Sequence, residues 1–277
     1  MSSETTQPTT VKSAQLNLKR GWLFDHSGDP RWNMAFDTWL ATEAPLAEGE
    51  FALRVYHWAP AGLTIGANQR WERALDERHL APDQIAVRRI TGGRAIFHDE
   101  REVTYAVALE CAALTPLVVS SISARIAEAI CAALVEIGAP ARIESSRRAQ
   151  PPNRGARSEH CFGSLTRHEI IADGLKIAAG AQRILRTRFF QHGSIKPHGF
   201  VAHPALFATS GKSTTEPPRE ARNSLPLKQS FERVFDCALN ECRPTTSERR
   251  SITALRETLD IRRGAPVRQP EQLGLAR

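Results

Sequence analysis

A cysteine, a lysine and a glycine pair are the residues of this chain whose types and spacing could carry out covalent chemistry. Cys161 ends a loop rich in proline and arginine, Lys176 follows on an apolar segment, and Gly92-Gly93 comes after two arginines. A thiolate can take up an acyl group as a thioester, and an ammonium group can stabilise the oxyanion that forms when a thioester is attacked. Glycines let a ligand approach the backbone closely. Together these residues indicate acyl transfer.

Cys161 is the candidate nucleophile among the five cysteines. Free cysteines most often act as small buried hydrophobic residues, so a reactive cysteine needs a distinctive setting. The loop before Cys161 predicts exposure, and cations near a thiol favour the reactive thiolate. These neighbouring cations are Arg154, Arg157 and His160. Cys111 and Cys131 instead lie on apolar segments, which predicts buried and inert thiols.

Lys176 allows two interpretations that the sequence alone leaves open. A lysine on an edge strand discourages aggregation. A lysine that points into a pocket could stabilise an oxyanion. Gly180 follows on the same apolar segment and permits close approach of the backbone to a ligand.

The segment around Gly92-Gly93 is also open to two interpretations. Glycines between strands most often form a hairpin turn, but the paired arginines before them could hold a phosphate or shape an acyl tunnel. The spacing fits neither a P-loop nor a dinucleotide-binding loop. His98 and Asp99 could supply a base and its orienting carboxylate, yet neighbours in a strand point to opposite faces, so a direct dyad is not expected.

The composition is that of a globular protein with a basic surface. The chain has 277 residues, 41% of them hydrophobic, and a formal net charge of +7. A solvated basic surface would explain this charge, and so would a docking surface for an acidic carrier protein. The basic residues form only short clusters and aromatic residues make up 6% of the chain, which argues against a platform for nucleic acid.

Cysteine usage and hydropathy predict a cytoplasmic protein without a membrane span. The cysteine count is odd and no secretory signal precedes it, which favours free thiols in a reducing compartment. No C-x-x-C pair is present, so a structural zinc site is not expected. The most apolar region, residues 105–122, is interrupted by a glutamate and a proline and reads as a core strand followed by a helix.

The elements that must position these residues follow from hydrophobic periodicity. Strands are expected at residues 21–24, 51–57 (half-buried), 63–65 and 85–89, with a strand at 95–97 paired to another at 102–109. One helix is expected to begin at Asp29-Pro30. Asn68 could cap the charged segment that follows the strand at 63–65. The strongest helix opens at Ser120 or Ser121 and ends at Gly138.

The second half of the chain continues this alternation. A hairpin is expected over residues 168–179 with its turn at Asp173-Gly174, followed by a strand pair around Gln182 and residues 189–192. Residues 208–225 are polar and read as a linker or loop, and terminal helices are expected at 227–242 and 251–259. The predicted fold class is α+β, with a mixed, largely antiparallel sheet, flanking helices and a helical C-terminal extension.

Three parts of the chain are distinguished on this basis. Residues 1–14 read as a disordered lead. Residues 15–205 form the catalytic domain, and residues 206–277 form a linker with C-terminal helices that pack on the same domain.

In order along the chain, these motifs resemble the biotin/lipoate ligase and octanoyltransferase superfamily, over about residues 22–195. The motifs that carry the resemblance are Trp32-Asn33-Met34-Ala35-Phe36-Asp37, Leu53-Arg54-Val55-Tyr56, Arg88-Arg89-Ile90-Thr91-Gly92-Gly93-Arg94-Ala95, His98-Asp99, Thr104-Tyr105, Cys161-Phe162, Lys176 with Gly180-Ala181-Gln182, and Gln191-His192-Gly193-Ser194-Ile195.

Within the superfamily the chain resembles the cysteine-dependent octanoyl-carrier-protein:protein N-octanoyltransferases. ATP-dependent lipoate ligases resemble one another in a Gly-Gly-Gly-Ala run and an H-D-x-G-N sequence, whereas here Arg94 replaces the third glycine and no Gly-Asn follows Asp99. The resemblance implies that Cys161 accepts the acyl group and that Lys176 lies beside it. It also implies a set of substrate-binding residues: Arg89, Thr91, Gly92, Gly93, Arg94, His98, Gly180 and Gln182.

The resemblance implies a complete reaction. The fold would enclose an acyl-binding tunnel, and octanoyl-acyl carrier protein would pass its acyl group through Cys161 to a lysine of a lipoyl-accepting domain, such as glycine cleavage H protein or 2-oxoacid dehydrogenase E2. Neither a metal nor ATP would be needed, and neither nucleic acid nor a membrane would be a partner. His160 is a candidate proton acceptor. Ala179 stands where the family pattern has a glycine, which would narrow the pocket or change its acyl preference.

Three alternatives stay open. An amidotransferase between lipoyl domains would use the same cysteine. An ATP-dependent lipoate-protein ligase would need ATP and not Cys161. A non-catalytic protein would bind acylated carrier protein in the same pocket without turnover.

Overall fold

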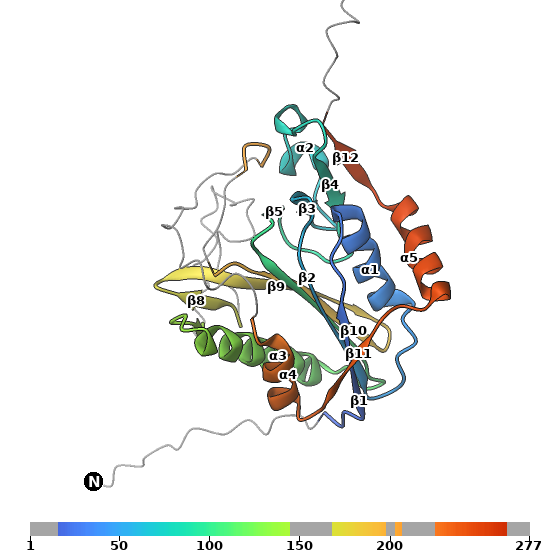
Figure 1. Cartoon of the computed structure of the whole chain (residues 1–277), viewed down its shortest axis with the longest axis vertical. Coiled ribbons are helices and arrows are strands. Elements are labelled where there is room, and N and C mark those ends of the chain that lie inside the picture. Colours follow the sequence, from blue (N-terminus) through green and yellow to red (C-terminus); the bar gives the residue numbers. More distant parts are fainter. Residues whose placement is uncertain (1–15, 145–167, 198–202, 207–224, 265–277) are drawn as a thin grey trace, which may run out of the picture.

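Two β-sheets form the framework of the protein (Figure 1). The computed structural model describes residues 16–144, 168–197, 203–206 and 225–264. The disordered lead predicted at 1–14, the polar segment at 208–224, and Cys161 with the loop before it lie outside these residues.

The larger sheet has eight strands in the order β11-β1-β2-β6-β10-β9-β8-β7. Its strands are β1 (Arg20–Asp25), β2 (Glu50–Tyr56), β6 (Val103–Glu110), β7 (Arg142–Ile143), β8 (Ile170–Ala172), β9 (Leu175–Leu185), β10 (Arg188–Ile195) and β11 (Leu239–Cys242). Strand β1 runs parallel to both of its neighbours, and all other pairs in this sheet are antiparallel. The prediction of a mixed, largely antiparallel sheet is confirmed.

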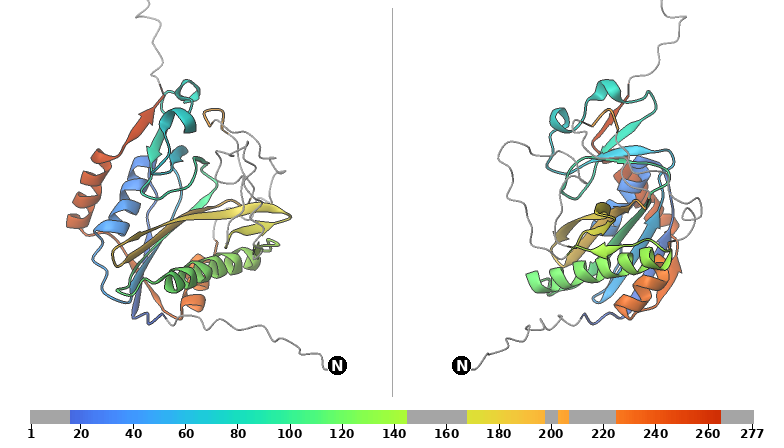
Figure 2. Two further views of the ribbon diagram at one scale, coloured as in Figure 1. Left: turned by 180° about the vertical axis from the view of Figure 1, so that it is seen from behind. Right: turned by 90° about the vertical axis from the view of Figure 1, so that its left-hand side faces the viewer.

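The smaller sheet has four strands in the order β12-β4-β3-β5. They are β3 (Gly62–Ile65), β4 (Ile85–Arg88), β5 (Ile96–His98) and β12 (Ile261–Arg263). The short helix α2 (Trp71–Ala74) and the 3-10 helix η1 (Glu77–His79) lie in the connection between β3 and β4. This sheet lies at one end of the larger one, so the loops between the two sheets can meet there (Figure 2).

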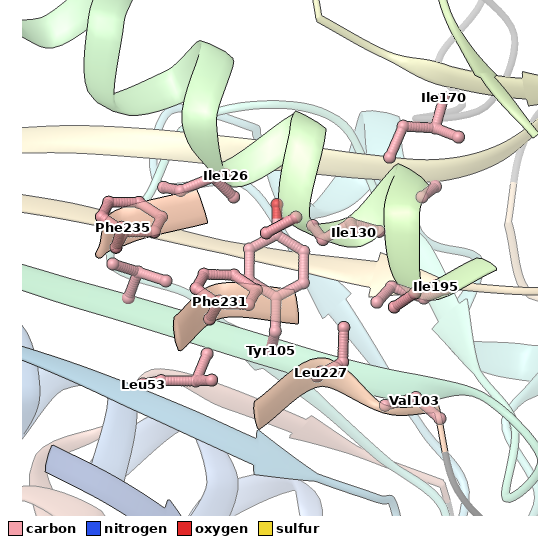
Figure 3. Close-up of a cluster of buried hydrophobic side chains, with 14 of the residues drawn as sticks. Leu53, Val103, Tyr105, Ile126, Ile130, Ile170, Ile195, Leu227, Phe231 and Phe235 are labelled. Atoms are coloured by element: carbon pink, nitrogen blue, oxygen red, sulfur yellow. The ribbon is translucent and has the colours of Figure 1, made fainter. Parts of the chain in front are cut away.

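Helices cover both faces of the larger sheet (Figure 2). On one face lie α3 (Pro116–Glu136) and α4 (Leu227–Phe235), and on the other lie α1 (Pro30–Thr42) and α5 (Thr246–Thr258). Figure 3 shows Ile126 and Ile130 of α3 opposite Phe231 and Phe235 of α4, with Tyr105 of the sheet between them. Each face of the sheet therefore has its own hydrophobic core.

Helix α3 is the one helix among the described residues that is long and apolar enough to cross a membrane. Its apolar stripe, which includes Ile122, Ile126 and Ile130, is buried against the larger sheet. The helix is thus a core helix of the domain, and residues 105–122 form a core strand followed by a helix, as predicted.

The helix boundaries follow local capping chemistry. Asp29 caps α1 by accepting a hydrogen bond from the Trp32 amide at 2.9 Å, and Pro30 is the first helical residue, as expected. Helix α3 begins at Pro116, earlier than the predicted Ser120 or Ser121, because the Thr115 side chain caps the amide of Val118.

Two local expectations for the first half of the chain were wrong. Strand β2 is buried on both faces and not half-buried, because helices cover both sides of the larger sheet. Asn68 does not cap the segment after it, since α2 begins at Trp71 with Arg70 at the cap position.

The pairing predicted between residues 95–97 and 102–109 was also wrong. Both strands exist, but β5 pairs with β3 in the smaller sheet, whereas β6 pairs with β2 and β10 in the larger one. The chain changes sheets at residues 99–102, where buried charged side chains replace a hairpin turn.

The helical C-terminal extension is a further correction. Residues 227–242 do not form one helix, because Asp236 adopts a left-handed conformation with φ of 49° and ends α4. Strand β11 then adds to the edge of the larger sheet beside β1, and β12 adds to the smaller sheet beside β4. The region from 225 to 264 is therefore part of both sheets, with α5 covering the predicted helix at 251–259.

This arrangement predicts that the C-terminal region is required for stability. Phe231 is fully buried and lies in a ring series with Phe235 and Phe51, at centroid separations of 5.6 and 5.2 Å. Phe231→Ala should lower the free energy of unfolding by about 3–5 kcal/mol, measured by urea denaturation. Leu117→Ala is the control: Leu117 is 70% exposed, and its change should stay within about 0.5 kcal/mol. Equal effects of the two substitutions would contradict this packing.

Candidate active site between the two sheets

A buried arginine, Arg89, holds the loop at residues 91–94 in place through hydrogen bonds. The Arg89 guanidinium donates hydrogen bonds to the carbonyl oxygens of Gly92 and Arg94, each at 2.8 Å. Gly93 has a φ of 92°, which favours glycine. A Cβ atom on Gly66 would lie 2.0 Å from the Gly93 oxygen, so this close contact requires glycine at 66 as well. The loop is therefore a defined structure and not an ordinary hairpin turn.

His192 of β10 ties this loop to the larger sheet. Its Nε2 atom lies 2.6 Å from the hydroxyl of Thr91, and its Nδ1 atom lies 2.7 Å from Oδ2 of Asp37 on α1. All three side chains are buried. A hydroxyl, an imidazole and a carboxylate thus form one hydrogen-bonded series from the loop to helix α1.

Asp37 is fixed in turn by a fully buried arginine. Arg54 of β2 donates to Oδ1 of Asp37 at 2.7 Å and to the side chain and backbone oxygens of Asn33 at 2.7 and 3.1 Å. Its guanidinium lies 3.7 Å from the centre of the Tyr56 ring, and the Tyr56 hydroxyl donates to Oδ2 of Asp37 at 2.7 Å. The carboxylate that orients His192 is therefore fully partnered.

A second series of the same kind contains His98. Its Nδ1 atom lies 2.7 Å from Oε1 of Glu102, and its Nε2 atom lies 2.8 Å from the hydroxyl of Thr64. The Thr64 oxygen also accepts a hydrogen bond from Arg89 at 3.2 Å. Asp99 points elsewhere and pairs with Lys196 at 3.2 Å, so His98 and Asp99 form no direct dyad, as the alternation of strand side chains predicted.

The charge states in this second series follow from burial and from the buried Lys196, whose ammonium lies 2.5 Å from Glu102. Burial would raise the pKa of Glu102, but attraction to His98 and Lys196 outweighs it and lowers this pKa to about 2. Burial outweighs the attraction of Glu102 for His98 and lowers the pKa of His98. Glu102 is therefore ionised and His98 neutral near pH 7.

A small cavity of about 30 Å³ lies where these groups meet. Its walls combine polar groups with apolar side chains and strand backbone from both sheets. The lining residues that bear on function are Met34, Trp58, Arg89, His98, Gly180 and His192. Arg89, His98 and Gly180 of the predicted substrate-binding set thus meet here, with Thr91 to Arg94 joined to them through Arg89 and His192.

Gln182 lies on the other face of the larger sheet. Its side chain oxygen accepts a hydrogen bond from Ser123 of α3 at 2.8 Å, and it lines a larger cavity of about 420 Å³ between α3 and β9. Gly180 borders both cavities. A Cβ atom there would lie 2.6 Å from the Tyr105 hydroxyl, so Gly180 leaves room for this ring. The structure does not bring Gln182 together with the loop at 91–94.

Lys176 is buried on β9 and forms an ion pair that the sequence did not reveal. Its Nζ atom lies 2.5 Å from Oε1 of Glu169, just before β8. Lys176 pairs in register with Ile171, and the side chain of Lys176 is 4% exposed, which argues against the solvent-exposed lysine of an edge strand. Lys176 lines neither of the two cavities, although Glu169 lines the larger one.

Several polar residues of the site had no role assigned from the sequence: Asp37, Arg54, Glu102, Glu169, His192 and Lys196. A signal was present for some of them, because Asp37 and Arg54 interrupt apolar periodicity within elements that are otherwise buried. Buried charged residues are rare unless they are paired. Cys161 and His160 lie outside the described residues, so their roles stay predictions.

Parts of the chain match a known protein family and several known proteins. Residues 29–214 match the model of the lipoyl protein ligase A/B catalytic domain. Two relatives are octanoyltransferase LipM of Moorella thermoacetica, 36% identical over 175 residues, and octanoyltransferase LipM of Staphylococcus aureus, 32% identical over 184 residues. These matches cover 60% and 63% of this chain, but only 61% and 65% of the relatives' own length.

Solved structures give the same fold at lower sequence identity. Lipoate-protein ligase A bound with ATP superimposes with a TM-score of 0.64 at 17% identity, covering 87% of this chain and 95% of that one. A bi-partite lipoate protein ligase from Thermoplasma acidophilum superimposes with a TM-score of 0.60 at 16% identity, covering 87% and 92% of the two chains. The α+β fold is thereby established.

The buried state of His98 predicts a pH dependence of stability. Its pKa is lowered by burial in the folded protein, whereas the unfolded chain binds a proton near pH 6.5. Because the unfolded state then binds more protons, the free energy of unfolding should fall as the pH drops below about 6.5. Urea denaturation at pH 7.5 and 5.5 should show a smaller pH effect in His98→Gln than in the native protein. An identical pH effect in both would show that His98 is not held neutral.

Proposed function

We propose, since the chain belongs to the lipoyl protein ligase A/B catalytic domain family, that it is an octanoyltransferase of protein lipoylation. Its substrates would be octanoyl-acyl carrier protein and a lysine of a lipoyl-accepting domain. The observation that carries the proposal is the 31–36% identity with several octanoyltransferases, over about 60% of the chain. The buried clamp on the loop at 91–94 supports it, because acyl transfer needs a rigid group of donors around the reacting carbonyl.

The proposed reaction has two half-reactions. His160 takes the proton of the Cys161 thiol, and the resulting thiolate attacks the carbonyl carbon of the octanoyl thioester. A new carbon–sulfur bond forms, the carbon–sulfur bond to the carrier protein breaks, and the carrier's sulfur leaves as a thiol with the proton from His160. The lysine amine of the acceptor then attacks the acyl-enzyme, an amide forms, and Cys161 is released. His160 is the proposed proton acceptor in this exchange.

Lys176 is the proposed electrostatic stabiliser of the oxyanion. Its ammonium is held by the carboxylate of Glu169 at 2.5 Å, so little side-chain reorganisation is needed during the reaction. This pairing supports a catalytic use of Lys176, because an ammonium that only discouraged edge-strand aggregation would remain solvated.

No ATP is proposed for this reaction, because the thioester of the donor is already activated. No metal is proposed either, and among the described residues no group of three histidine, cysteine, aspartate or glutamate side chains is arranged to hold one. The protein is proposed to act in the cytoplasm, where the cysteines that the structure describes would stay as free thiols. The acidic surface of the carrier protein would meet the net positive charge of the chain.

The small cavity is the proposed site of the acyl group. At about 30 Å³ it has room for about one water molecule, so an eight-carbon chain would enter only if its walls move. Met34 is in this wall, and the unbranched thioether of methionine can repack at low cost.

The acyl-enzyme can be detected directly. After the protein is mixed with octanoyl-acyl carrier protein without ATP, intact-protein mass spectrometry should show one octanoyl adduct that hydroxylamine removes. Cys161→Ala should abolish the adduct, because the thiol that forms the thioester is gone. Cys131→Ala, on helix α3, should retain it.

The other outcomes separate the alternative functions. An adduct that forms from an octanoylated lipoyl domain, and not from octanoyl-acyl carrier protein, would establish an amidotransferase. Modification of the acceptor that needs lipoate and ATP and survives Cys161→Ala would establish a ligase. Binding of acylated carrier protein without an adduct or product would leave the non-catalytic function.

The role of Lys176 can be tested in the same assay. Lys176→Met combined with Glu169→Gln removes both charges without leaving a buried unpaired carboxylate. Acyl-enzyme formation at saturating donor should slow by about 100- to 1,000-fold, because the oxyanion loses its cation. The control Lys228→Met breaks a more exposed pair with Glu241 and should keep the native rate. A native rate in the double variant would remove Lys176 from the mechanism.

A further inference from the structure

Two hydrogen-bonded series with the same kinds of side chain lead to the loop at residues 91–94. One reaches it directly and the other through Arg89. Each begins with a buried carboxylate, continues through a histidine and reaches a threonine hydroxyl. In the first series Asp37 and His192 lead to Thr91, which is itself part of the loop. In the second, Glu102 and His98 lead to Thr64, whose oxygen meets Arg89.

The proton positions in both series follow from the charged partners. Asp37 is paired with Arg54 and Glu102 with Lys196, so both carboxylates are ionised acceptors. Each carboxylate therefore takes the Nδ1 proton of its histidine. A neutral imidazole then has an acceptor at Nε2, which takes the proton of the threonine hydroxyl.

The second series has a fixed direction from Arg89 to Glu102. Arg89 can only donate, so the Thr64 oxygen accepts its N–H, and the Thr64 hydroxyl proton is directed to His98. Each histidine therefore acts on the loop through a different contact. His192 bonds to Thr91 of the loop. His98 acts through Thr64 on Arg89, which holds the carbonyl groups of Gly92 and Arg94.

The clamp on the Gly92 carbonyl also sets the direction of an amide. In a trans peptide group the C=O and the following N–H point to opposite sides. Because the Gly92 oxygen faces the buried Arg89, the N–H of Gly93 points away from it. Gly93 is an exposed residue, so a ligand can reach this part of the loop. Backbone N–H groups held in this way are donors to a developing oxyanion.

We infer that His98 and His192 are positioning residues whose hydrogen bonds hold the loop at 91–94 so that the Gly93 N–H meets the acyl carbonyl. This inference rests on the proposed acyl transfer. A second proton on either histidine turns Nε2 from an acceptor into a donor. Thr64 already accepts from Arg89, so protonation of His98 would leave two donors directed at one hydroxyl oxygen and weaken the clamp.

The charged groups that face each histidine come from a few neighbouring side chains. His192 faces Asp37 and its partner Arg54, while Ala181 and Ala106, opposite it on β9 and β6, carry no charge. His98 faces charged groups from three directions and stacks on the Trp58 ring with a centroid separation of 3.9 Å. These charged groups are Glu102, Lys196 and Arg89.

The test compares Thr91→Val with Thr91→Ser. Valine keeps the shape of threonine and removes the hydroxyl, whereas serine keeps the hydroxyl. Acyl-enzyme formation at saturating octanoyl-acyl carrier protein should slow by about 100-fold in Thr91→Val, and Thr91→Ser should recover most of the native rate. Donor affinity should change little, because the loop acts on the reacting carbonyl.

The pH profile separates positioning from a merely structural role. The native rate should fall at acid pH, below the ordinary range of an imidazole, because burial lowers the pKa of His98. Thr91→Val should show a lower rate at every pH, since His192 no longer holds the loop. A native rate in Thr91→Val, or equal losses in the valine and serine variants, would overturn the inference.

Hydrogen exchange tests the loop independently of any activity. After correction for the intrinsic pH dependence of exchange, amides in the peptide covering residues 89–97 should exchange at least 10-fold faster in Thr91→Val than in the native protein or Thr91→Ser. If native protein forms no octanoyl adduct, the proposed function fails, and unchanged exchange would still overturn the loop assignment separately. If Thr91→Val does not fold, Thr64→Val and Thr64→Ser make the same comparison through Arg89.

Discussion

The buried ion pair between Arg54 and Asp37 is the interaction on which the rest of the site depends. Both side chains are almost fully removed from solvent, and together they join strand β2 to helix α1. Such a pair gains little net stability, because the cost of desolvating two charges offsets their attraction. Its value lies in specificity: either charge alone would be costly to bury, so the helix and the strand can pack in only one register. From Asp37 the same constraint reaches His192 and then Thr91 of the loop.

The site is thus built from connections between elements that are distant in the sequence. The loop at 91–94 follows β4 of the smaller sheet, but its anchors come from β3, β10 and α1. Lys196 at the end of β10 reaches back to Glu102 and Asp99, where the chain passes from one sheet to the other. Because most of these buried polar groups are hydrogen-bonded or ion-paired, the space between the sheets is polar at one point and apolar around it.

Much of this arrangement could be predicted from the sequence, and the failures have identifiable causes. Hydrophobic periodicity located most strands and the core helix α3, since one-sided burial leaves a direct trace in the residue pattern. Strand pairing left no such trace: β5 and β6 are adjacent in sequence yet belong to different sheets. The C-terminal strands were missed because they are short, and β11 directly follows the left-handed turn at Asp236.

The site itself was predicted in part. Arg89 and Gly180 line the small cavity, and the loop at residues 91–94 is hydrogen-bonded to Arg89. The motifs that contain these residues carried the family resemblance. The ion pair of Lys176 with Glu169 was not predicted, because the two residues are brought together only by the turn between β8 and β9 and by an irregularity in their pairing. Gln182 was grouped with the loop by its motif, whereas strand geometry places its side chain under α3.

The late position of β11 in the chain has a consequence for how the protein is made. Asn240 donates a hydrogen bond to the backbone oxygen of Gly21 across 219 positions of sequence, and among the described strands β11 is the neighbour of β1 on that side of the sheet. During synthesis the edge of β1 therefore keeps open N–H and C=O groups until β11, at Leu239–Cys242, has left the ribosome. Contacts of such high sequence separation slow folding, and an open strand edge invites pairing with other chains. Production of this protein should thus depend on chaperone capacity more than its ordinary size suggests.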